Sequence, residues 1–160
     1  MQTAMRAMGN MSETKRRVAL ACIPAALTIA FIPHAVKLFV MVSKLKKYDN
    51  VEPRKHMASI EGDTPAERLV RRCQACHANG LETFAMFSAA CLSAFAAKAK
   101  SGAVMRNSLN FVIGRIVYTA FYLGGINEAV SALRTLAFFH NMHCCIELFK
   151  LAAKAPLAQK

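Results

Sequence analysis

One long apolar run, residues 18–42, limits the possible folds more than any other feature of the sequence. Its 25 residues are interrupted by basic side chains only at His34 and Lys37. About 20 apolar residues are enough for a helix to cross the hydrocarbon core of a bilayer, which is roughly 30 Å thick. The run therefore predicts a tilted membrane-spanning helix, with kinks at Pro24 and Pro33.

Three further helices are predicted from their start and stop signals. The sequence Thr64-Pro65-Ala66-Glu67 places an N-cap threonine before a proline, and Glu67 completes a capping box three residues after the threonine. Gly124-Gly125 is a typical helix end. We expect an all-α fold, an integral membrane four-helix bundle with antiparallel helices and one long polar connection. The expected helices are 18–42, 65–99, 108–123 and 127–153.

The overall composition also favours a membrane protein. Hydrophobic residues make up 55% of the chain and the mean hydropathy is +0.28, whereas soluble domains are about 45 to 50% apolar. A soluble bundle with an enlarged core is the alternative. The predicted organisation is a basic N-terminal segment (1–17), a four-helix membrane domain (18–155) and a C-terminal tail (156–160). The expected location is the endoplasmic reticulum or another organelle membrane, with the mitochondrial inner membrane as an alternative.

The net charge of +12 raises the question of a nucleic-acid partner. The basic residues form no single face or tail and no basic surface interleaved with aromatic residues, so no nucleic acid is expected. They instead flank the apolar runs, as cations do at lipid headgroups, which makes membrane lipids the expected surroundings. Outside the spans they split ten against eight between the two sides, so their number does not set the orientation.

The six cysteines predict no disulfide framework, because most of them lie inside apolar runs, where cysteine behaves as a small hydrophobe. These are Cys22, Cys91, Cys144 and Cys145. Cys73-Gln74-Ala75-Cys76-His77 matches the C-x-x-C-H signature of c-type haem attachment. It falls well inside a predicted helix, among packed neighbours, so a membrane cytochrome is a minor alternative. No metal site is predicted.

Polar and charged side chains recur inside three of the four predicted helices. A charged side chain at the bilayer centre costs roughly 2.5 to 3.5 kcal/mol, so it normally faces an interior site. A spacing of three or four residues places each set on one helix face. Singly they are explained as structural glue between helices, but together they favour a site for a small zwitterionic ligand with several negative charges. The sets are Arg72, Cys76, Asn79 and Glu82 or Thr83; Arg115, Tyr118 and Tyr122; and Arg134, Phe138 and Asn141.

Three segments carry a family pattern. Residues 72–83 contain His-Ala-Asn-x-x-Glu, residues 114–123 contain Arg-x-x-Tyr-x-x-x-Tyr, and residues 132–135 read Ala-Leu-Arg-Thr. In combination they resemble the MAPEG family, the membrane-associated proteins of eicosanoid and glutathione metabolism. The resemblance covers residues 18–150 and offers a cause for His77 that does not involve haem.

The resemblance implies a homotrimer that binds glutathione as its cofactor between neighbouring subunits. Asn79 and Glu82 would hold the peptide part of glutathione, while Arg115 and Tyr118 would contact its carboxylates and backbone. The glutathione-binding residues expected in this way are Asn79, Glu82, Arg115, Tyr118, Tyr122 and Arg72.

Arg134 is the expected catalytic residue, because it matches the arginine that stabilises the glutathione thiolate in the family. The thiolate is the nucleophile, and a thiol with a pKa near 8.5 is only slightly ionised at pH 7. Two positions depart from the family pattern. Ala78 stands where an arginine often precedes the asparagine, and Phe138 replaces a tyrosine one turn after the arginine.

The leading hypothesis is a glutathione-dependent membrane transferase or peroxidase acting on a lipophilic electrophile or hydroperoxide that arrives from the bilayer. The alternative is a non-catalytic MAPEG-fold structural subunit of a larger membrane complex, in which the polar residues only hold helices together.

Overall fold

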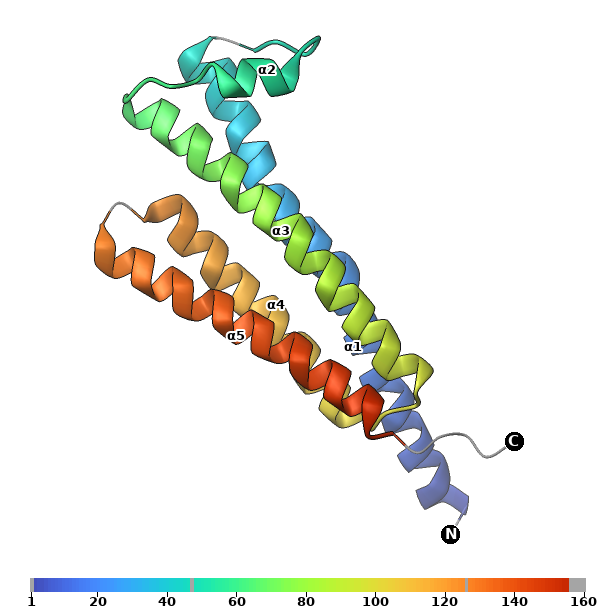
Figure 1. Cartoon of the computed structure of the whole chain (residues 1–160). Helices are drawn as coiled ribbons and strands as arrows, with labels where there is room; N and C mark the ends of the chain where they lie inside the picture. The colour runs from blue at the N-terminus through green and yellow to red at the C-terminus, as the bar shows by residue number, and fades with distance from the viewer. Residues whose placement is uncertain (1, 47, 126, 156–160) are drawn as a thin grey trace.

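The computed structural model describes residues 2–46, 48–125 and 127–155, so the predicted tail 156–160 lies outside the described residues. Four long helices form the molecule, together with one short helix and a π-helical turn (Figure 1). The prediction of an all-helical four-helix bundle is confirmed. The elements are α1 (Gln2–Val40), η1 (Met41–Leu45), α2 (Pro53–Ala58), α3 (Pro65–Ala96), α4 (Ser101–Gly124) and α5 (Glu128–Ala153).

The capping box at the start of α3 is present as predicted. Thr64 Oγ1 accepts a hydrogen bond from the Glu67 backbone N–H at 3.3 Å, and the Thr64 N–H donates to Glu67 Oε2 at 3.1 Å. Two helices are longer than expected, since α1 begins at Gln2 rather than residue 18 and α4 begins at Ser101 rather than residue 108. The added turns mix polar residues with alanine, valine and methionine and contain no proline. The apolar pattern therefore marked the hydrophobic part of each helix and not its first residue.

The sequence did not predict the short helix α2. The residues before it and at its start are typical of turns, so the whole segment was expected to be a loop. The Asp49 carboxylate accepts hydrogen bonds from the backbone N–H groups of Val51 at 2.7 Å and Glu52 at 3.2 Å. These bonds hold the pKa of Asp49 below its ordinary value. The resulting Asx turn leads directly into Pro53, the first residue of α2. The rest of the connection packs against η1 and the first turns of α3.

In the bundle, α1 packs against α3 and α4, and α5 packs against the same two helices. Figure 1 shows α1 with α3 and α4 with α5 as two pairs that converge toward the termini and separate toward α2. The rings of Phe87 and Phe111 stack with their centroids 4.1 Å apart and join α3 to α4. A Cβ on Gly80 would lie 2.9 Å from the Ala30 Cβ, so this glycine permits the close contact between α3 and α1.

The outer surface of the bundle is strongly apolar. Phe39, Leu136 and Phe139 are 68%, 65% and 62% exposed, and other large hydrophobic side chains are exposed on all four long helices. By length and composition, one segment among the described helices, Ser12–Leu45, is long and apolar enough to cross a membrane, and an 18-residue window within it has a mean hydropathy of 1.9. Apolar patches of this extent are typical of surfaces that contact lipid or further subunits.

Candidate functional site

The predicted polar residues of α3 and α4 meet inside the bundle. Arg115 Nη1 donates a hydrogen bond to Asn79 Oδ1 at 3.0 Å, which joins the two helices. The Arg115 guanidinium also lies 4.4 Å from the centroid of the Tyr118 ring. Arg115 is only 2% exposed and Tyr118 5% exposed. A buried cation needs such partners, because removing one leaves an uncompensated charge.

The same row of contacts continues to α5. The Tyr118 and Tyr122 rings have centroids 5.4 Å apart, and the Arg134 guanidinium lies 4.3 Å from the centroid of the Tyr122 ring. Both arginines are within the distance at which a cation is attracted to an aromatic face. We refer to the resulting series of contacts across three helices as the arginine–tyrosine ladder. Its members are Asn79, Arg115, Tyr118, Tyr122 and Arg134.

Helix geometry explains why the ladder forms. Arg115, Tyr118 and Tyr122 follow one another at spacings of three and four residues, which places them on one face of α4. Gly114 brings α5 close to this face, since a Cβ there would collide with Asn141 Oδ1 and with the His140 ring. The sequence therefore determines both the alignment of the ladder along α4 and the close approach of α5.

A cavity of about 580 Å³ lies at the α2 end of the bundle, and Arg134 is part of its wall. Arg72 also lines it and bridges α3 to α4, since its Nη2 donates to the Leu123 carbonyl oxygen at 3.4 Å. The Arg72 Nε is buried and has no hydrogen-bond partner among the described residues. The described residues that line it are Arg68, Arg72, Gly125, Asn127, Glu128, Ser131 and Arg134.

The start of α5 orients one side of this cavity. Asn127 is the N-cap, and its Oδ1 accepts a hydrogen bond from the Val130 N–H at 3.0 Å. Glu128, Ser131 and Arg134 then follow at intervals of three residues on one face of the helix. Three guanidinium groups and one carboxylate line the cavity. This arrangement suits a ligand that carries more than one negative charge and a single positive charge.

The MAPEG family model matches residues 18–154, which include nearly all of the four-helix bundle. The chain belongs to the MAPEG family. Its fold is accordingly an integral membrane four-helix bundle, as the sequence predicts. No curated protein and no solved structure matches the chain.

One predicted site residue of this MAPEG protein, Glu82, lies apart from the others. It is exposed on α3, and none of the described residues forms a hydrogen bond or ion pair with its carboxylate. The exposed face of α3 around it consists largely of small residues. These are Ala75, Ala78, Ala85, Ala89 and Ala96. Within one subunit, Glu82 therefore contributes to neither the ladder nor the cavity.

The C-x-x-C-H sequence of this MAPEG protein lies inside α3. Cys73 is fully buried and Cys76 is 1% exposed. His77 Nδ1 lies 2.8 Å from the Ala30 carbonyl oxygen. Because a carbonyl oxygen can only accept, Nδ1 carries the proton. The motif is thus explained by packing between α3 and α1, and among the described residues no three metal-binding side chains converge.

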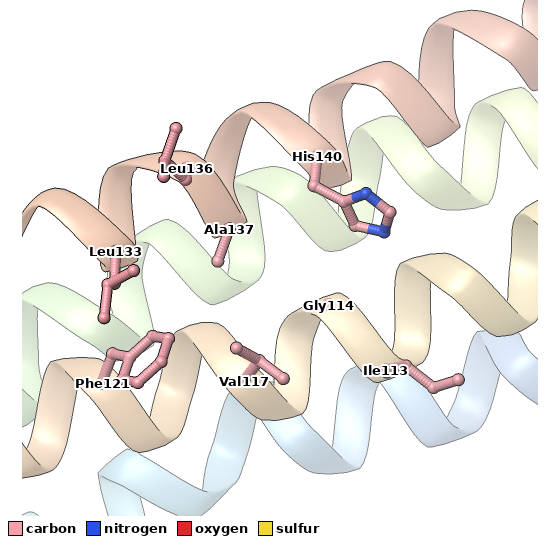
Figure 2. A pocket seen from close by; sticks show the side chains of 8 residues that line it. All are labelled: Ile113, Gly114, Val117, Phe121, Leu133, Leu136, Ala137 and His140. Atoms are coloured by element: carbon pink, nitrogen blue, oxygen red, sulfur yellow. The ribbon is translucent and has the colours of Figure 1, made fainter. Parts of the chain in front are cut away.

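A second hollow of about 350 Å³ lies between α4 and α5 of the MAPEG bundle. Figure 2 shows Leu133, Ala137 and His140 of α5 facing Val117 and Phe121 of α4 across it. His140 Nε2 is within 3.4 Å of the Asn110 carbonyl oxygen. Its other described lining residues are Ile113, Gly114 and Leu136.

We call the cavity of about 580 Å³ the cationic cavity, because three arginines line it. Sequence reasoning did not identify several of its residues. Arg68 is one turn before Arg72, while Glu128 and Ser131 precede Arg134 on the same helix face. Their spacing therefore indicated that they lie on the same helix faces as Arg72 and Arg134. The signal was weak because they lie near helix ends, where polar residues normally face water.

Proposed function

We propose that this protein is a glutathione-dependent membrane transferase or peroxidase that acts on a lipophilic electrophile or hydroperoxide. The observation that carries the proposal is the position of Arg134. Its guanidinium is held against the Tyr122 ring, at the wall of a cavity that two further arginines line.

The cavity fits the size and charge of glutathione. Ligand pockets typically have volumes of about 300 to 1,000 Å³, and this one has about 580 Å³. Arg68 and Arg72 supply paired N–H donors for carboxylates, and Glu128 supplies a carboxylate for an ammonium group. The buried and unpartnered Nε of Arg72 supports this assignment, because such a donor is costly unless something accepts its hydrogen bond.

Arg134 would stabilise the negative charge on the ligand's sulfur. Bound glutathione would supply a nucleophilic or reducing thiol. Lowering a thiol pKa by about two units requires roughly 2.7 kcal/mol of preferential stabilisation of the charged form. A nearby guanidinium shielded from water supplies an effect of this size. In the peroxidase reaction, two thiols yield a disulfide while the hydroperoxide becomes an alcohol and water.

Arg115 and Tyr118 do not line the cavity and would support the residues of its wall. Their burial favours a role in positioning over direct ligand contact. Arg115 fixes the Asn79 amide, and Tyr118 packs against Tyr122, the ring on which Arg134 rests. We therefore assign the ladder to holding one group of the cavity wall, Arg134, in a fixed position.

A homotrimer would complete the site. The exposed Glu82, surrounded by alanines on α3, supports this part of the proposal, since an unpaired carboxylate on an apolar helix face is expensive in a membrane. Small residues also allow helices of neighbouring subunits to approach closely. Glu82 of one subunit would then reach the glutathione held by the arginines of the next.

Calorimetric titration of the detergent-solubilised protein with glutathione tests the proposal. We expect saturable binding that is weakened at least about tenfold in Arg134→Ala, which corresponds to roughly 1.4 kcal/mol, together with loss of turnover. Arg106→Ala is a suitable control, because Arg106 is exposed on α4 in the half nearer the termini. Unchanged glutathione turnover in Arg134→Ala would refute the catalytic assignment.

One observation favours the alternative, a structural subunit of a larger membrane complex. Both arginines of the ladder have partners within it, one hydrogen bond and two contacts with aromatic rings, as residues that only join helices would. The same titration separates the two functions. Wild-type protein that shows no glutathione binding and migrates only within a larger assembly would establish the structural role.

A further inference from the structure

The end of the bundle that holds both termini carries a ring of basic side chains. We call this ring the basic collar. Its members are Lys15, Arg16, Arg17, Lys98, Lys100, Arg106, Lys150 and Lys154. They come from the first part of α1, the connection between α3 and α4, the start of α4 and the end of α5, which Figure 1 shows at the same end of the molecule.

Contacts between elements hold parts of the collar together. Ser12 Oγ on α1 lies 3.1 Å from Ser101 Oγ on α4. The Arg16 guanidinium lies 5.4 Å from the centroid of the Phe95 ring on α3. Lys15 extends toward Gly102, where its Nζ would be 3.9 Å from an added Cβ. The collar is therefore one surface built from several elements.

Few acids neutralise the collar. Among the described side chains at this end, the acids are Glu13 and Glu147, so eight cations and two acids leave a net charge of +6. Glu13 pairs with Arg17 at 2.6 Å, and Glu147 pairs with Lys150 at 2.8 Å. These pairs are exposed and weak, and no ion pair among the described residues involves the other collar cations.

The opposite end is close to neutral. Its described residues include eight cations and six acids, a net charge of +2, and several of them pair locally. Lys55 pairs with Glu52 at 3.0 Å, while Arg68 and Arg71 both lie within 4 Å of Asp63. The cations are Lys44, Lys46, Arg54, Lys55, Arg68, Arg71, Arg72 and Arg134, and the acids are Asp49, Glu52, Glu61, Asp63, Glu67 and Glu128. The two ends therefore have equal numbers of described cations but net charges of +6 and +2.

Exposed apolar side chains lie next to the collar on each long helix. Leu20, Leu92, Leu109 and Phe149 are 43%, 52%, 37% and 44% exposed. Each is within six residues of a collar cation, which is roughly 9 Å along a helix. Lysine and arginine at such a boundary extend their charged groups into the headgroup layer while their stems remain on apolar surface.

We propose that the basic collar binds anionic phospholipid headgroups, such as those of phosphatidylserine, in preference to zwitterionic headgroups. The apolar band beside the collar identifies the partner as lipid, because it places the cations at the depth of the headgroup phosphates. The near-neutral opposite end lacks this preference. The inference is independent of the glutathione assignment, since the cationic cavity lies at the opposite end of the bundle.

Spin-label electron paramagnetic resonance on the reconstituted full-length protein tests the proposal. The vesicles consist of phosphatidylcholine with a trace of spin-labelled phosphatidylserine or spin-labelled phosphatidylcholine. The motionally restricted fraction of each label reports its association with the protein. We expect phosphatidylserine to associate about three- to fivefold more strongly, and this preference to shrink toward unity as salt screens the cations.

Two matched variants locate the effect. Lys98→Gln, Lys100→Gln, Arg106→Gln and Lys154→Gln together remove four collar cations, and we expect this variant to lose most of the preference. Lys44→Gln, Lys46→Gln, Arg54→Gln and Lys55→Gln together remove four cations from the opposite end, and we expect this variant to retain it. All eight side chains are exposed, so both variants should fold.

Three outcomes would overturn the proposal. One is equal association of the two labelled lipids with the wild-type protein. Another is an equal loss of preference in both variants. The third is binding of a single-stranded oligonucleotide to the collar without any preference for phosphatidylserine. Glutathione titrations of both variants serve as a separate readout and should match the wild type.

Discussion

At the scale of single residues, the unusual feature is a guanidinium inside an apolar bundle. Arg115 is held by the Asn79 amide oxygen and by the face of the Tyr118 ring, so its charge has partners on two helices. Arg134, at the other end of the ladder, has one aromatic partner and one side open to the cavity. The same residue type therefore joins two helices in one position and lines the cavity in the other, where we propose that it faces the ligand.

Replacing the Tyr122 ring tests whether the ladder positions Arg134. Tyr122→Leu removes the aromatic face, and a cation–π contact is worth about 0.5 to 2 kcal/mol, so glutathione affinity should fall roughly two- to thirtyfold. Tyr122→Phe keeps the face and should bind as the wild type does. Calorimetric titration compares the two variants. Equal weakening in both would show that the hydroxyl matters instead of the ring.

Gly114 controls the approach of α5 to the ladder. In Gly114→Ala the new Cβ would collide with Asn141 Oδ1 and the His140 ring, so unfolding in detergent should require about 1 to 3 kcal/mol less free energy. Gly124→Ala is the matched control, because nothing lies within 4 Å of a Cβ there. That variant should be as stable as the wild type or slightly more so. Chemical denaturation followed by circular dichroism measures both, and equal stability would argue against the close helix contact.

At the scale of elements, α3 connects the polar end of the molecule to its apolar body. The capping box at Thr64 fixes its first turn, and Arg68 and Arg72 on the next turns line the cavity. The start of α5 plays a matching role, because the Asn127 cap orients the helix that carries Arg134. Both walls of the cavity thus depend on capped helix starts.

Removing the α3 cap should loosen one wall of the cavity. Thr64→Ala is expected to lower stability by about 1 kcal/mol and to speed amide hydrogen exchange in the first turn of α3. Thr135→Ala is the control, since the Thr135 hydroxyl donates to the Ser131 carbonyl oxygen within α5 and caps no helix end. Hydrogen exchange followed by mass spectrometry reads out each segment. Unchanged protection of the amides of residues 66–68 would show that packing alone fixes this turn.

Local sequence signals predicted the four long helices and the polar stripes, because capping, helix ends and hydrophobic spacing act within a few residues. They did not determine which stripes meet. Asn79 and Glu82 are three residues apart and were expected to act together, yet Asn79 bonds Arg115 inside the bundle while Glu82 is exposed. That difference depends on how α3 is rotated against α4, which packing over the whole bundle decides. The helix α2 was missed because it has only six residues and begins among residues that are typical of turns.

At the scale of the whole molecule, the two ends differ in their charged groups. The α2 end carries the cationic cavity, and the end with the termini carries the basic collar. Between them the outer surface is apolar, with Glu82 as an isolated acid on the alanine face of α3. A single subunit leaves this carboxylate without a partner among the described residues, so the complete molecule requires neighbouring subunits in our proposal.

Glu82→Ala tests the proposed trimer and the proposed glutathione contact at once. If Glu82 bonds a neighbouring subunit, its removal should weaken assembly, and native mass spectrometry should detect monomers beside trimers at concentrations where the wild type is fully trimeric. Glutathione affinity should fall as well, because a shared site is lost with the assembly. A variant that remains trimeric but loses glutathione affinity would make Glu82 a ligand contact only. Glu13→Ala, which removes an exposed acid in the first part of α1, should leave both properties intact. If Glu82→Ala still forms trimers and still binds glutathione, the exposed face of α3 takes no part in the site.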